Sequence, residues 1–109
     1  MQRMGHCIGL RADAIAQYKQ VHAQVWPEVL AVISRANIRN YSIYLREPEN
    51  LLFAYWEYHG SDFTKDAAAM AESEAMRRWW ALCDPMQDAL PTRADGAWWA
   101  QMEEVFHLD

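Results

Sequence analysis

The segment from Tyr18 to Trp26 holds the residues of this sequence that are best suited to proton transfer. Tyr18, His22 and Trp26 stand four positions apart, a spacing that aligns side chains on one face of a helix. That face is predicted to be buried, because it also carries the apolar residues Ile15, Val25, Val29, Val32 and Ile33. An imidazole and a phenol would therefore point into the protein beside an indole. This arrangement is typical of a small, dry pocket that contains a proton donor.

His22 has two interpretations. A single histidine on an apolar helix face is more often a hydrogen-bonded core residue than a catalyst. Here two phenols accompany it, because Tyr41 on a later strand is expected to project into the same space. An imidazole titrates close to neutral pH and can both give and take a proton. Three proton-handling groups in one apolar cluster favour a catalytic pocket over a plain core.

Two tryptophan pairs form the second candidate feature. Adjacent helix residues point about 100° apart, so only one of Trp79 and Trp80 can face squarely into a core. The other is expected to lie at a partner surface or to line a ligand cleft, and the two interpretations are equally good. For Trp98 and Trp99, a hydrophobic anchor at a strand start or subunit boundary is the favoured interpretation.

Other kinds of site lack their usual residues. His6, His59 and His107 are dispersed, with no Cys, Asp or Glu at ligand spacing, so no metal and no cofactor is predicted. Glu57 and Glu104 fall on predicted strands, where they are either pocket carboxylates or outward-facing charges. The sequence has no paired-carboxylate hydrolase pattern, nucleophile elbow or phosphate-binding glycine loop.

Length and composition predict one globular domain over residues 1–109, with 52% hydrophobic and 23% charged residues. A net charge of -5 without a basic cluster argues against a nucleic-acid partner. No apolar run approaches the ~20 residues that span a bilayer, and the N-terminus has no signal-peptide pattern, so no membrane partner is expected. Cys7 and Cys83 are interpreted as reduced thiols of a cytoplasmic protein, with a single disulfide as the alternative.

Hydrophobic periodicity predicts the order of the secondary-structure elements. The expected elements are a strand at 3–10, a helix at 13–35 kinked or divided at Pro27, strands at 40–45 and 51–58 joined by a polar turn, a helix at 63–83 with a break near 72–74, and a last strand at about 102–108. This β-α-β-β-α-β order predicts a ferredoxin-like α+β fold, a four-stranded antiparallel sheet with both helices on one face.

The other face of the sheet is expected to carry aromatic side chains from the hairpin. These side chains are too apolar to be left in water. An isologous dimer that packs sheet against sheet is the simplest way to cover them. A homodimer is therefore predicted.

Several segments together resemble the L-rhamnose mutarotase family. In chain order they are Tyr18-x-x-x-His22-x-x-x-Trp26-Pro27-Glu28, residues 40–45, residues 51–54, Trp79-Trp80 and residues 104–106. They span nearly the whole chain, and together they are specific although each alone is weak. One stretch departs from the pattern: rhamnose-type members usually carry a loop close to Asn-Pro-Asp-Asn-Ser-Pro, where this chain has residues 87–96. Fucose-type mutarotases differ in the same stretch, so L-fucose is the alternative substrate.

The resemblance implies a dimeric α/β-barrel isomerase that interconverts the α and β anomers of a 6-deoxyhexose. It implies that His22 is the proton donor and that Tyr18, Tyr41, Trp79 and Trp80 bind the sugar. Mutarotation protonates the ring oxygen while the anomeric hydroxyl loses its proton, so it needs positioned acid and base groups and no cofactor. His22 would protonate the ring oxygen, and Tyr18 or an ordered water would accept the anomeric proton.

Two functions from other classes stay open on the residues alone. Some small dimeric ferredoxin-like monooxygenases bind haem through a histidine, and His22 could take that role. Alternatively, the chain is a non-catalytic sugar-binding module in which His22 only organises the core.

Overall fold

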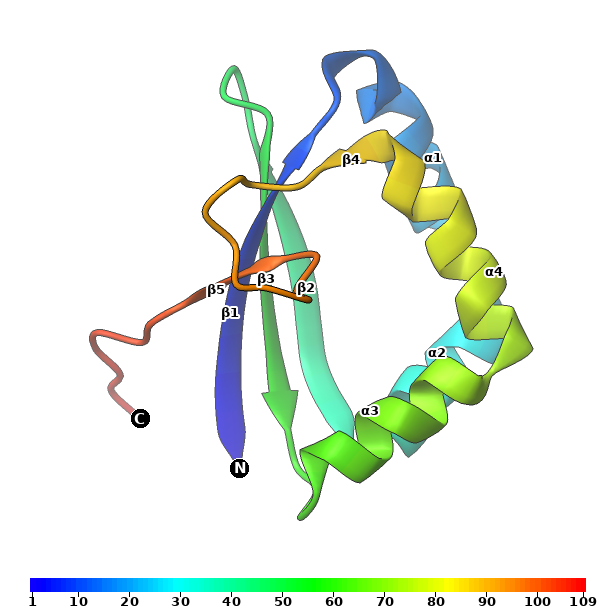
Figure 1. The fold of residues 1–109 in the computed structure, drawn as a ribbon, viewed down its shortest axis with the longest axis vertical. Helices are drawn as coiled ribbons and strands as arrows, with labels where there is room; N and C mark the ends of the chain where they lie inside the picture. Colours follow the sequence, from blue (N-terminus) through cyan, green and yellow to red (C-terminus); the bar gives the residue numbers. More distant parts are fainter.

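A curled antiparallel sheet forms one layer of the protein, and an arc of helices covers one of its faces (Figure 1). The structure is a computed structural model that describes residues 1–109. Its elements are β1 (Gln2–Leu10), α1 (Ile15–Ala23), α2 (Pro27–Arg35), β2 (Ile38–Arg46), β3 (Leu51–Tyr58), α3 (Phe63–Glu72), α4 (Glu74–Cys83), β4 (Gln87–Asp88) and β5 (Ala100–Met102), with short 3-10 turns at Ala12–Ala14 and Asp84–Met86. The predicted ferredoxin-like α+β fold is therefore confirmed.

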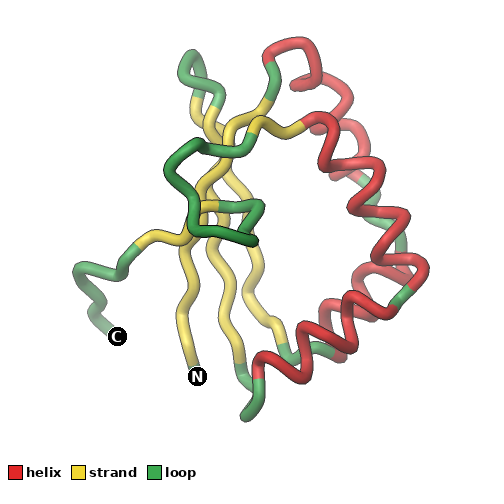
Figure 2. Tube along the Cα trace, in the orientation of Figure 1, coloured by secondary structure: helices red, strands yellow, loops and turns green.

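The strands lie in the order β2-β3-β1-β4, and β5 also pairs with β1 (Figure 2). Ile8 of β1 lies opposite Leu52 of β3, and both are fully buried beneath the helices. Because side chains alternate along a strand, the even-numbered residues of β1 face the helices and the odd-numbered ones face away. The core between the two layers contains Ile8, Leu10, Ala14, Tyr18, Val29, Val32, Leu52, Met76, Trp79, Cys83 and Met86.

Both predicted long helices are divided where the sequence indicates. Pro27 occupies the first turn of α2, where its missing N–H costs no hydrogen bond. Ser73 separates α3 from α4, and its hydroxyl accepts a hydrogen bond from the Met76 N–H at 3.2 Å, which caps α4. The resulting helices are short, and none has the length and apolarity needed to cross a lipid bilayer.

The predicted last strand at 102–108 is wrong in position. The ladder ends where Met102 lies opposite Gly5, and residues 103–109 are exposed without regular structure. Beyond that pair, Arg3 and Glu104 contact each other through their side chains, with Nε 2.9 Å from Oε2. Alternating apolar residues predict a strand only where a partner strand and a face to bury them are both present. The short β4, which the sequence pattern did not indicate, instead pairs with the end of β1.

Candidate active site

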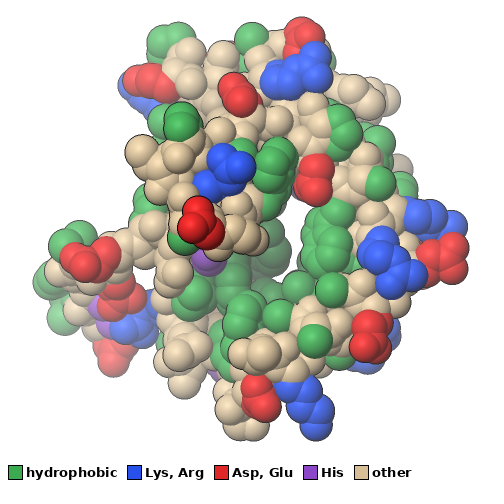
Figure 3. All heavy atoms as spheres, viewed as in Figure 1, with side chains coloured by type: hydrophobic (Ala, Val, Ile, Leu, Met, Phe, Trp, Pro, Cys, Tyr) green, Lys and Arg blue, Asp and Glu red, His purple; other side chains and the backbone are tan.

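A cavity of about 320 Å³ lies between the inner face of the sheet and helices α1, α2 and α4. The space-filling view shows this side of the molecule hollowed between the two layers, with mainly hydrophobic side chains around the hollow (Figure 3). The cavity residues are His22, Val25, Val29, Leu30, Ile33, Tyr41, Ile43 and Trp79. A volume of this size lies at the lower end of the roughly 300–1,000 Å³ typical of small-molecule sites.

His22 is the titratable group of this apolar cavity with a pKa nearest neutrality. Its Nδ1 lies 2.8 Å from the backbone oxygen of Tyr18. A carbonyl oxygen only accepts hydrogen bonds, so Nδ1 carries the hydrogen and the neutral ring has its lone pair on Nε2. Burial lowers the pKa of His22 from its usual 6.5, and the bond to Tyr18 only partly opposes this. At neutral pH the imidazole is therefore uncharged and able to accept a proton at Nε2.

Tyr18 is buried directly beside His22, and the two rings stack with their centroids 4.1 Å apart. Gln87 Nε2 lies 3.2 Å from the Tyr18 hydroxyl, and Trp98 Nε1 donates to Gln87 Oε1 at 2.7 Å. Burial raises the pKa of Tyr18, which keeps the phenol protonated at neutral pH. The contact of Gln87 with Tyr18 was not predicted from the sequence. Its only signal was that the stretch departing from the family pattern begins at Gln87.

Tyr41 reaches the cavity because of an irregularity in β2. The pairing of β2 with β3 shifts by one residue between Arg39 and Ser42, and Asn40 has a φ of 52°. Such a bulge reverses the alternation of side chains beyond it, so Tyr41 and Ile43 face the helices. Tyr41 is 42% exposed and lines the cavity, and desolvation of its phenol there raises its pKa to about 12.

Trp79 is the tryptophan of the pair that lines the cavity. Its ring meets His22 edge-on, with the centroids 5.1 Å apart and the planes at 65°. Trp26 packs against the same ring in a similar way, with the centroids 5.2 Å apart. Trp80 is half-buried against the core and does not line the cavity. Of the predicted site residues, His22, Tyr41 and Trp79 line the cavity. Tyr18 is buried against His22 without lining the cavity, and Trp80 lies apart.

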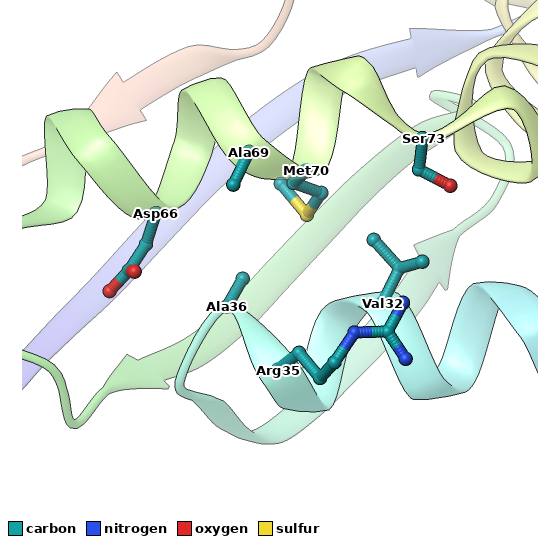
Figure 4. Close-up of a pocket in the computed structure, with 7 residues that line it drawn as sticks. All are labelled: Val32, Arg35, Ala36, Asp66, Ala69, Met70 and Ser73. Carbon is teal, nitrogen blue, oxygen red and sulfur yellow. The ribbon is translucent and has the colours of Figure 1, made fainter.

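A second, smaller pocket of about 80 Å³ lies between α2 and α3 (Figure 4). Asp66 and Ser73 stand at opposite ends of α3 in this view, and Arg35 extends along α2 below them. The Asp66 carboxylate accepts hydrogen bonds from the Tyr58 hydroxyl and from Asn37 Nδ2. These bonds attach α3 to the last residue of β3 and to the segment after α2, so the carboxylate has a structural role.

The carboxylates whose roles the sequence left open lie outside the cavity. Glu57 accepts hydrogen bonds from Asn40, Tyr55 and His59, and these contacts lower its pKa to about 2. Glu104 pairs with Arg3. Both are outward-facing charges with protein partners. No group of three or more His, Cys, Asp or Glu side chains is arranged to hold a metal ion.

Comparison with known protein families identifies the family of this chain. The family model described as L-rhamnose mutarotase matches residues 3–108 of the sequence. The chain belongs to the L-rhamnose mutarotase family. Members of this family are carbohydrate isomerases, so the family assignment bears out the predicted class of enzyme.

Relatives named L-rhamnose mutarotase match the chain end to end. The protein of Mannheimia succiniciproducens is 34% identical over 110 residues, and that of Lactiplantibacillus plantarum is 32% identical over 109 residues, with all of both chains covered in each case. The crystal structure of an L-rhamnose mutarotase from Formosa agariphila superposes with a TM-score of 0.79 at 25% identity, again over the full length of both chains.

Proposed function

We propose that this protein catalyses the interconversion of the α and β anomers of L-rhamnose. The observation that carries the proposal is the placement of His22, whose Nδ1 is bonded to the backbone while its ring lines an apolar cavity. The chain belongs to the L-rhamnose mutarotase family. An imidazole that can transfer protons, in a small and mainly apolar cavity, suits a reaction on a small sugar.

In the proposed mechanism His22 delivers the proton that opens the sugar ring. The anomeric hydroxyl and the ring oxygen are bonded to the same carbon, so a single nitrogen can serve both. Neutral Nε2 takes the anomeric proton and passes it to the ring oxygen as the bond from that oxygen to the anomeric carbon breaks. The anomeric carbon becomes the aldehyde, which rotates before the reverse transfer closes the ring on its other face.

The aromatic residues at the cavity, together with Tyr18 beside His22, suit the two kinds of sugar surface. A 6-deoxyhexose has an apolar face of C–H groups and a methyl, and the indole of Trp79 offers a matching flat surface. Tyr41 and Tyr18 supply hydroxyl groups for the polar edge of the sugar. Trp80 is proposed as a further sugar-binding residue on the family resemblance alone.

We further propose that the enzyme works as a homodimer in the cytoplasm. Aromatic side chains on the outer face of the sheet support the dimer, because Tyr44 there is 66% exposed. Both cysteines, Cys7 and Cys83, are buried and unbridged, as expected in a reducing compartment.

Exchange NMR tests the activity directly. Saturating one anomeric proton of L-rhamnose and observing the other measures the exchange rate with and without protein, and L-fucose and D-glucose serve as comparison sugars. We expect faster exchange of L-rhamnose than in buffer and a weaker effect on D-glucose. If L-fucose responds more strongly than L-rhamnose, the proposed substrate is wrong, and if no sugar responds, the proposed activity is wrong.

A further inference from the structure

All buried residues of the protein except Gln87 are hydrophobic or aromatic, and Gln87 lies against the side chain of Tyr18. Its place follows from the sheet, because β4 pairs with β1 so that Gln87 lies opposite Leu10 and shares its inward face. From there the amide reaches two aromatic partners. The Gln87 Nε2 to Tyr18 hydroxyl distance is 3.2 Å, and the Trp98 Nε1 to Gln87 Oε1 distance is 2.7 Å.

The indole of Trp98 determines which way this amide points. The oxygen and nitrogen of a glutamine amide are assigned from their hydrogen-bond partners. An indole N–H only donates, so the amide atom that faces Trp98 is the oxygen. The NH2 group must then face Tyr18, whose hydroxyl oxygen accepts the bond.

This orientation leaves the hydroxyl proton of Tyr18 without a protein acceptor. The only hydrogen bond at this hydroxyl is the one it accepts from Gln87. A phenol with one lone pair engaged and its proton free is prepared to donate to a ligand. Its neighbour on α1 is His22, which lines the cavity.

We propose that Gln87, held in one orientation by Trp98, is a positioning residue that makes Tyr18 a hydrogen-bond donor to an oxygen of the bound sugar. This inference rests on the proposed mutarotase function. It assigns the donor role to Tyr18 and leaves acceptance of the anomeric proton to His22 rather than to the phenol. Burial favours the same assignment, since the raised pKa of Tyr18 opposes loss of its proton.

The loop that carries Trp98 is itself organised. Arg93 donates to the backbone oxygens of Ala97 and Leu90, and its guanidinium carbon lies 5.9 Å from the centre of the Trp98 ring. Arg93, within the stretch 87–96, therefore supports the loop that carries Trp98, and the Trp98 indole N–H in turn contacts Gln87 at the start of that stretch.

The decisive variant is Gln87→Glu, which keeps the size and shape of the side chain. An ionised carboxylate still accepts from Trp98 but has no hydrogen for Tyr18, so the phenol turns its proton towards residue 87 and away from the sugar. We expect kcat/KM for L-rhamnose exchange to fall about 10-fold at pH values where the carboxylate is charged. When the carboxyl group is protonated it can donate to Tyr18 again, so the ratio of variant to unaltered activity should rise as the pH falls.

Trp98→Phe is the companion variant, because it keeps an aromatic ring at a position that is 39% exposed and removes only the N–H. It should fold and lose less activity than Gln87→Glu. Without the indole N–H, the Gln87 amide can also adopt the flipped orientation, in which its oxygen faces Tyr18, but the original orientation stays accessible. If Gln87→Glu has the same kcat/KM as the unaltered protein from about pH 5 to about pH 8, the proposal is overturned. If that variant does not fold, unchanged kcat/KM for Trp98→Phe overturns it. If the unaltered protein does not accelerate anomer exchange, the proposed function is wrong, and this inference fails with it.

Discussion

The imidazole Nδ1 of His22 lies 2.8 Å from the backbone oxygen of Tyr18, one turn earlier in α1. This bond fixes the ring orientation and the tautomer together, because a backbone oxygen can only accept. The only nitrogen of His22 left for substrate is then Nε2. Because His22 lines the cavity, we expect this nitrogen to meet the substrate.

Replacing the imidazole tests whether this nitrogen transfers the proton. We expect His22→Asn to leave a folded protein that still binds L-rhamnose, because the ring is only half-buried, and to slow anomer exchange by about 10²–10⁴-fold. Saturation-difference NMR measures binding and exchange NMR measures rate on the same sample. His59→Asn is the matched control, since His59 is exposed and bonded to Glu57 outside the cavity. Full activity in His22→Asn would exclude the proposed role.

The pH dependence of the rate follows from the lowered pKa of His22. Because the folded-state pKa lies below the usual 6.5, the neutral form dominates above that value and is lost only under more acidic conditions. We expect kcat/KM to be flat near neutrality and to fall towards acid with a midpoint below 6.5. Exchange rates corrected for the buffer reaction, with circular dichroism at each pH, measure this. A midpoint above 6.5 would contradict the assignment of the neutral ring as the resting form.

Trp79 is expected to contribute to sugar affinity. Trp79→Phe keeps an aromatic face of smaller area and should raise KM several-fold with a smaller change in kcat, whereas truncation to alanine would cost about 3–5 kcal/mol of stability. Trp80→Phe is the natural comparison, because Trp80 lies outside the cavity lining. We expect it to change KM less, and an equal or larger effect would place the sugar nearer to Trp80 than the cavity suggests.

The close approach of β4 to β1 at Gly9 supports the position of Gln87. A Cβ added at Gly9 would lie 2.6 Å from the backbone oxygen of Asp88, whereas at Gly5 it would meet only the side chain of Met102, no nearer than 3.5 Å. We therefore expect Gly9→Ala to displace β4, to cost about 1–3 kcal/mol of unfolding free energy and to reduce activity. Gly5→Ala, the control on the same strand and face, should do neither. Urea unfolding and exchange rates measure both effects, and equal behaviour of the two variants would contradict this account.

The outer face of the sheet is expected to form the dimer interface. Tyr44, Phe53 and Cys7 form one cross-strand row on that face. We expect a dimer mass in light scattering, and a shift to monomer in Tyr44→Glu because a buried charge opposes association. Lys65→Glu, an exposed charge change on α3, should stay dimeric. A monomeric mass for the unaltered chain would show that the face is covered in some other way.

Most of the local structure could be predicted from the sequence. Periodicity and helix-breaking residues identified both divided helices and the hairpin, because these depend on neighbours along the chain. The spacing of Tyr18 and His22 also placed both on one helix face without further information.

The other groups that lie near His22 depend on contacts between distant parts of the chain. Tyr41 faces the cavity because the bulge at Asn40 shifts the alternation in β2, and strand periodicity alone does not reveal a bulge. Gln87 contacts Tyr18 because a short strand pairs with Leu10 far away in the sequence. Residues 103–109 have no partner strand and are exposed. Each outcome depends on pairing between distant segments, which local pattern does not encode.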